Sequence, residues 1–145
     1  MIAITEFKKG SKMKGFISKG LIGLTILATT TWANVARADW VRVLTDQQSN
    51  AVFHIEPSTI QFDNGRYYFW ANISLIEPRY YPEYEGDLAS ANLFLATECN
   101  SNSIQKYQEE GFDIEGNSLG TLEGSINYPI IGRGTKAIQN FVCNR

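Results

Sequence analysis

Residues 58–76 read STIQFDNGRYYFWANISLI, two β-rich runs joined by Asp63, Asn64 and Gly65. Asn-Gly between such runs is the strongest short-range signal for a hairpin, because both central turn positions need a positive φ. In the second run the side chains alternate, which is typical of a strand with one buried face. One face is expected to carry Tyr67, Phe69, Ala71, Ile73 and Leu75, and the other Tyr68, Trp70, Asn72 and Ser74.

Short β-rich runs on either side of this hairpin extend the same pattern. Turn-forming residues at 46–50 and 115–117 separate them, and they span residues 40–45, 51–55, 91–99, 104–114 and 118–124. Regular short strands joined by tight turns indicate an antiparallel sheet rather than alternating strands and helices. We expect a sheet of about six strands.

The C-terminal segment, GRGTKAIQNFVC at 132–143, breaks the strand pattern. Thr135 is a candidate N-cap, and an apolar stripe at helical spacing follows it. The stripe consists of Ala137, Ile138, Phe141 and Val142. A helix continued through Cys143 would point that sulfur away from the stripe, since successive residues turn by about 100°. Either the helix ends by Val142, or the segment is a strand with Ala137, Phe141 and Cys143 on one face; the capping signal favours the helix.

The first 38 residues have the layout of a secretory signal peptide. Five lysines precede the apolar run LIGLTILA at 21–28, and the stretch ends in an Ala-x-Ala pattern at Ala36 and Ala38. The apolar run is too short to span a bilayer, which needs about 20 residues. We therefore expect 1–38 to be removed and 39–145 to be exported as one domain, with Met1 or Met13 as the start.

Removal of 1–38 would leave an acidic chain. Residues 39–145 keep 7 of the 13 Lys and Arg residues but 14 of the 15 Asp and Glu residues. That balance argues against nucleic acid and against an anionic membrane surface as partners, because both need clustered basic side chains. Residues 39–145 also contain no apolar run long enough for a transmembrane segment.

Two cysteines, Cys99 and Cys143, stand in this chain. In an exported protein an even number of cysteines indicates a disulfide, and two cysteines allow one pairing within the chain. A bridge between them would close a loop worth about 4 kcal/mol in the chain-entropy model. A metal or redox pair would need a CxxC spacing or a histidine-rich partner segment.

The residue inventory offers little for catalysis. The one histidine, His54, lies on a predicted strand and is interpreted as a sheet-surface residue, and we predict no catalytic residue, no metal site and no cofactor. The strongest binding candidate is the tyrosine-rich stretch RYYPEYE at 79–85, with Arg79, Tyr80, Tyr81 and Tyr84, because tyrosine is enriched in recognition surfaces. The alternative, which we favour slightly, is that these rings fold back over the sheet as a satellite cluster.

Several short stretches, in order and spacing, make the chain resemble the surface-adhesin protein E-like family of exported bacterial proteins. They are Trp40, VFHIEPSTI at 52–60, DNGRYYFWANIS at 63–74, CNSNSIQKY at 99–107, FDIEGNSL at 112–119 and AIQNFVC at 137–143. The resemblance implies an α+β fold, in which a curved antiparallel sheet carries a C-terminal helix tied to its concave face by the disulfide. The chain departs from the family pattern at 77–90, where a short turn would be expected.

The family is named for adhesion of a pathogen member to host matrix and serum proteins. The resemblance thus implies an exported, non-catalytic binding module that recognises an extracellular or envelope macromolecule, located in the periplasm or at the cell surface. A sheet edge could pair two copies into a homodimer. The alternative is a periplasmic structural or stress-related envelope protein without an external ligand, and a small hydrolase is disfavoured by the inventory above.

Overall fold

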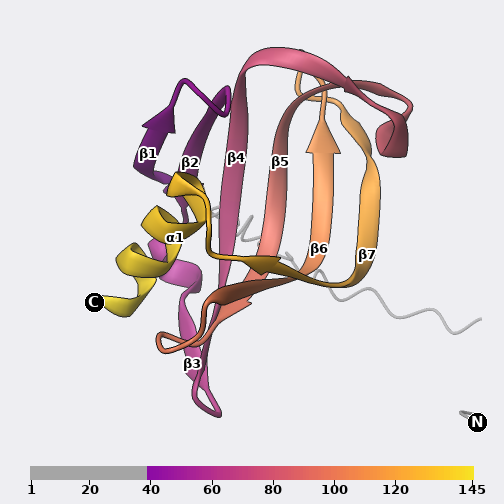
Figure 1. Cartoon of the computed structure of the whole chain (residues 1–145). Helices are drawn as coiled ribbons and strands as arrows, with labels where there is room; N and C mark the ends of the chain where they lie inside the picture. Colours follow the sequence, from indigo (N-terminus) through magenta and orange to yellow (C-terminus); the bar gives the residue numbers. More distant parts are fainter. Residues whose placement is uncertain (1–38) are drawn as a thin grey trace, which may run out of the picture. The chain divides into compact units, whose positions relative to one another are not determined.

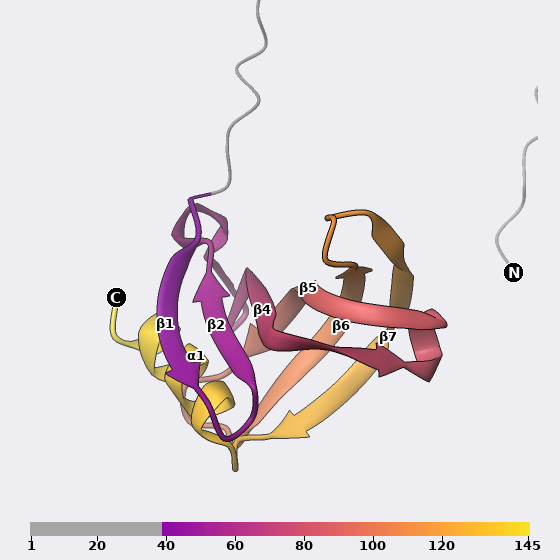
Figure 2. The same cartoon turned by 90° about the horizontal axis from the view of Figure 1, so that it is seen from above.

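The computed structural model describes residues 39–145, so the predicted signal peptide lies outside the described residues. These residues form one antiparallel sheet of seven strands and a C-terminal helix, α1 (Figure 1). The elements are β1 Val41–Asp46, β2 Ala51–Ile55, β3 Gln61–Asp63, β4 Arg66–Tyr81, β5 Gly86–Thr97, β6 Ser103–Phe112, β7 Ser118–Pro129 and α1 Arg133–Cys143. The strand order is β1-β2-β4-β5-β6-β7, with β3 paired to β4. The predicted α+β class is confirmed, and the view from above shows the curvature of the sheet (Figure 2).

The β3–β4 hairpin forms where the Asn-Gly pair predicts it. Asn64 and Gly65 both have positive φ, 49° and 83°, and Asp63 pairs with Arg66 across the turn. Along β4 the expected alternation is confirmed, since Phe69 and Ala71 are fully buried on one face of the sheet. We call this face, which carries the hydrophobic core, the inner face.

The segment 77–90, which lies outside the predicted strands, forms the end of a hairpin. Strand β4 continues to Tyr81, one 3-10 turn covers Pro82–Tyr84, and β5 begins at Gly86. The register between β4 and β5 slips between Ser74 and Arg79. Asn50 bridges this irregularity, because its side-chain amide donates to the Glu77 carbonyl at 2.8 Å and its Oδ1 accepts from the Glu77 N–H at 3.0 Å. Proline and glutamate suggest a loop here, but cross-strand pairing overrides their low β propensity.

The expected N-cap, Thr135, lies inside α1, because the helix begins two residues earlier, at Arg133. Gly132 is the N-cap, and the Thr135 hydroxyl donates to the Gly132 carbonyl instead of capping the helix. Two α1 side chains, Ile138 and Val142, are buried against the inner face. Gly134 permits this approach, since a Cβ there would lie 2.2 Å from Cζ of Phe53.

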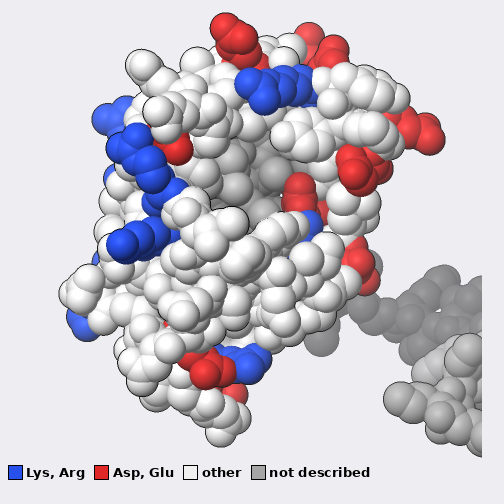
Figure 3. Space-filling view, viewed as in Figure 1, with Lys and Arg blue, Asp and Glu red and all other residues white. Residues whose placement is uncertain are grey.

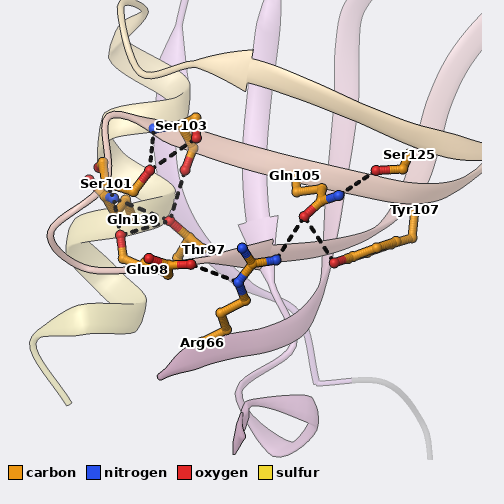
Figure 4. Close-up of polar contacts among 9 residues, drawn as sticks. All are labelled: Arg66, Thr97, Glu98, Ser101, Ser103, Gln105, Tyr107, Ser125 and Gln139. Atoms are coloured by element: carbon orange, nitrogen blue, oxygen red, sulfur yellow. Dashed lines mark hydrogen bonds and ion pairs between the residues drawn. The ribbon is translucent and has the colours of Figure 1, made fainter. Parts of the chain in front are cut away.

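The disulfide between Cys99 and Cys143 is present, as predicted. The expectation that the helix ends by Val142 was wrong, because α1 includes Cys143. Cys99 lies in the loop after β5 rather than on the inner face, so the sulfur of Cys143 need not point with the apolar stripe. Gln139 adds a second tether to the same loop region, donating to the Thr97 hydroxyl at 3.2 Å and to the Ser101 carbonyl at 2.9 Å (Figure 4).

Candidate functional site

Helix α1 covers only part of the inner face of the sheet. Helix α1 has 11 residues and packs mainly on β1 and β2, so the apolar side chains of the central strands extend beyond it. The result is a cavity of about 240 Å³, which we call the apolar cavity. Its apolar lining consists of Phe53, Ile73, Leu93, Leu95, Ile104 and Ile138.

A second cavity of about 270 Å³ lies under the end of the β4–β5 hairpin. We call it the tyrosine cavity, because three tyrosines line it together with charged side chains. These residues are Tyr81, Tyr84, Tyr128, Glu83, Lys106 and Glu109. Glu109 and Tyr128 line both cavities, so the two adjoin, and we refer to them together as the groove.

A buried ion pair stands where the cavities meet. Lys106 and Glu109 form a salt bridge, with side chains only 6% and 17% exposed, and the Lys106 ammonium lies 5.7 Å from the centre of the Tyr128 ring. A bulge in β6 makes the pair possible, because both β5 and β7 skip Tyr107 in their pairing. The extra residue resets the alternation, and two residues three apart then face the same side.

The ion pair controls the charge of Lys106. Burial lowers the pKa of Lys106, but the hydrogen bond and the charge of Glu109, aided by Tyr128, more than reverse this and raise it. Lys106 therefore stays protonated at neutral pH, and its charge is opposed by that of Glu109. Lys106 and Glu109 thus form a pair without net charge where the two cavities meet.

Tyr84 is the most unusual group of the groove. It is 8% exposed, and its ring packs so closely on β6 that a Cβ at Gly111 would lie 2.7 Å from its Cζ. Its hydroxyl is buried and has no hydrogen-bond partner within the described chain. Burial raises the pKa of Tyr84, and the nearby carboxylate of Glu109 raises it further, both by its charge and as an acceptor for the hydroxyl proton, although the two groups do not meet in hydrogen-bond geometry here. Such an orphan hydroxyl costs stability, which makes it a candidate contact for a ligand.

The structure divides the four binding candidates predicted from the sequence. Tyr81 and Tyr84 line the tyrosine cavity, whereas Arg79 and Tyr80 do not line the groove. Tyr80 is 63% exposed, so of the two interpretations of the segment, burial describes Tyr84 and exposure describes Tyr80.

Sequence reasoning missed Lys106, Glu109 and Tyr128. One signal was available for Lys106, since it lies two residues after Ile104 and so shares the inward-facing positions of the strand. Strict alternation places Glu109 on the opposite face, and only the bulge at Tyr107 brings it inward.

The outer face and the loop after β5 hold polar and aromatic groups whose contacts are already made within the chain. Arg66 pairs with Glu98 at 2.7 Å and donates to Gln105 at 3.0 Å, as Figure 4 shows. Both partners of the ion pair are nearly half exposed, so solvent screens their attraction and the pair adds little to stability. The polar side chains around the small hollow of about 50 Å³ here therefore serve contacts within the fold, and we do not interpret the hollow as a binding site.

His54 lies on the outer face of β2, between the buried residues Phe53 and Ile55, as predicted. Burial lowers the pKa of His54, and the charge of Arg42 adds to this against a hydrogen bond with Asn72. Residues 39–145 contain no cluster of three or more side chains suited to hold a metal ion. None of their helices is long and apolar enough to cross a membrane.

The fold matches solved structures of Haemophilus influenzae protein E. One crystal form has 16% identity and a TM-score of 0.54, covering 74% of this chain and 89% of that chain. The selenomethionine form has 15% identity, a TM-score of 0.53, and coverage of 75% and 88%. Protein E from a non-typeable strain has 17% identity, a TM-score of 0.51, and coverage of 77% and 80%. No family model and no curated protein matches the sequence. The expected resemblance is thus confirmed for the fold, which is all that likeness at these identities shows.

Proposed function

We propose that the chain is an exported, non-catalytic binding module, adhesin-like in its action, that recognises an extracellular or envelope protein. The observation that carries this proposal is the groove. It combines an apolar cavity with a few convergent polar groups, the arrangement typical of binding sites. The buried hydroxyl of Tyr84, unsatisfied within the described chain, gives a ligand a contact to complete.

Three further observations support export and recognition. The disulfide suits an oxidising compartment outside the cytoplasm. The fold is that of Haemophilus influenzae protein E. The sequence of 1–38 has the layout of a signal peptide. In the described sheet β1 and β7 are edge strands, and pairing along either edge would give the homodimer.

The test begins with the full chain carrying a C-terminal tag in a bacterial host. Protein recovered from the periplasm and the medium is sequenced at its N-terminus, and we expect Asp39 as the first residue. Protein that keeps residues 21–28 contradicts the predicted signal peptide.

The recovered protein is then tested by interferometry against immobilised matrix, serum and envelope protein fractions. Saturable binding that untagged protein competes away is expected with at least one fraction. No saturable signal with any fraction contradicts the binding function. Purely periplasmic recovery together with that negative result favours the structural envelope role instead.

A further inference from the structure

The end of the β4–β5 hairpin carries more negative than positive charge, since Arg79 is the one basic residue of 77–90 beside four acidic ones, Glu77, Glu83, Glu85 and Asp87. Residues 81–87 include Glu83, Glu85 and Asp87 and no Lys or Arg. Figure 3 shows most of the acidic side chains of this view on the side of the hairpin and most Lys and Arg on the opposite side over β1 and α1, with one basic group at the top beside the acidic ones. Glu83 lines the tyrosine cavity, and Lys106 is neutralised by Glu109. The mouth of this cavity therefore keeps a net negative charge.

The interior of the tyrosine cavity suits a cation in three ways. The Tyr84 hydroxyl oxygen can accept a hydrogen bond, since it has no partner in the described chain. Three tyrosine rings line the cavity, and aromatic faces attract ammonium and guanidinium groups. The carboxylate of Glu83, which is not paired with Lys106 as Glu109 is, would repel an anion and attract a positive charge.

The adjoining apolar cavity needs a different group. Its lining is hydrophobic apart from its border with the tyrosine cavity and Thr135 on α1. Burying an apolar side chain there is favourable relative to leaving it exposed to water. Side chains two residues apart in an extended peptide point to the same side about 7 Å from each other, so one short segment can serve two adjoining cavities.

We propose that the groove binds an extended segment of a partner protein, with a basic side chain in the tyrosine cavity and an apolar side chain in the apolar cavity. This rests on the proposed binding function and deepens it by naming the chemistry of the recognised segment. Specificity comes from the pairing of the two side chains, since either alone leaves one cavity unfilled.

The first experiment titrates the ¹⁵N-labelled mature chain, 39–145, with short blocked peptides and follows amide chemical shifts. The probe is acetyl-Gly-Arg-Gly-Leu-Gly-amide, with a second version that carries two glycines between Arg and Leu. Matched peptides replace Arg by Gln or Leu by Gly. We expect the Arg–Leu probe to bind at least about fivefold more tightly than either matched peptide, with shifts at groove residues such as Ile104 and Glu109.

Three variants assign the two cavities. Tyr84→Phe removes only the hydroxyl, so the melting temperature is expected to hold or rise while the preference for Arg over Gln falls about fivefold. Glu83→Gln, at an exposed position, is expected to lower that preference about two- to threefold. Thr135→Leu places a larger side chain in the apolar cavity and so reduces its free volume. This variant is expected to lose the preference for Leu over Gly. The matched control is Asp63→Asn at the β3–β4 turn, which changes the same charge outside both cavities.

Equal affinity for the Arg and Gln peptides overturns the proposal, as does equal affinity for Leu and Gly. Absence of binding at millimolar peptide, or shifts confined to residues outside the groove, overturns it as well. A protein partner whose affinity is unchanged by Tyr84→Phe and Glu83→Gln overturns the groove assignment but leaves the binding function standing. If no protein partner is found while the selective peptide binding is retained, the groove assignment stands and the proposed binding function is contradicted.

Discussion

Replacing Cys99 and Cys143 together by alanine is expected to destabilise the domain strongly. The two residues are 44 apart, and the chain-entropy model assigns a loop of this size about 4 kcal/mol. For a domain of this length that loss lowers the melting temperature by about 15 °C. Helix α1 should respond first, because its 11 residues are too few for a stable isolated helix and depend on their attachment to the sheet.

The assay is urea and thermal denaturation of the double variant beside the wild type, with hydrogen exchange of the α1 amides. Wild type kept in reducing agent serves as the control and should melt with the double variant. Alanine at the helix end is a favourable helix residue, so substitution itself contributes little. A loss of free energy below about 1 kcal/mol, or α1 amides protected as in the wild type, would refute the view that the bridge holds the helix.

Three further substitutions or conditions probe the inner face. Gly134→Ala should cost about 1–3 kcal/mol in urea denaturation, because its Cβ would meet the Phe53 ring at 2.2 Å; unchanged stability would mean that the ring moves freely. Lys106→Met should cost about 2–3 kcal/mol by leaving Glu109 unpaired, with part recovered when Glu109→Gln is added; a stabilised single variant would contradict this. Since the pKa values of Tyr84 and Lys106 are both raised on folding, their contributions to stability are complete below their unfolded values near pH 10 and are lost above them. The wild type should therefore lose stability more steeply than Tyr84→Phe between about pH 9 and pH 11, and parallel curves would contradict the assignment.

Local sequence signals predicted the elements of the fold well where one residue type has one structural use. Asn64 and Gly65 predicted their turn because few other residues accept both positive φ values. The alternation in β4 predicted its buried face because a half-buried strand has no other way to satisfy both sides. The extension of β4 and β5 into 77–90 was not predicted, because the prolines and glutamates of this segment disfavour strands locally, whereas pairing with β5 and the two hydrogen bonds from Asn50 act over a long sequence separation.

The groove was beyond sequence reasoning for a different physical reason. Its polar centre depends on one extra residue in β6, and a bulge changes the face of every later side chain without changing the composition of the strand. Tyr84 and Tyr81 could be proposed as binding residues, but nothing local places them opposite Lys106 and Glu109. That encounter is set by the slip in β4 and by the end of the hairpin, both of which are tertiary features.

One side of the apolar cavity is formed by α1, the element of the fold that is least stable on its own. Thr135 and Ile138 of α1 line that cavity, and α1 is fixed to the loop after β5 by Cys143 and Gln139. The tyrosine cavity, in contrast, is built from sheet residues and the hairpin, none of which is in the disulfide. Loss of the bridge should therefore affect recognition of the apolar side chain more than recognition of the basic one. On this argument the C-terminal disulfide does more than stabilise the domain, because it maintains one half of the proposed binding groove.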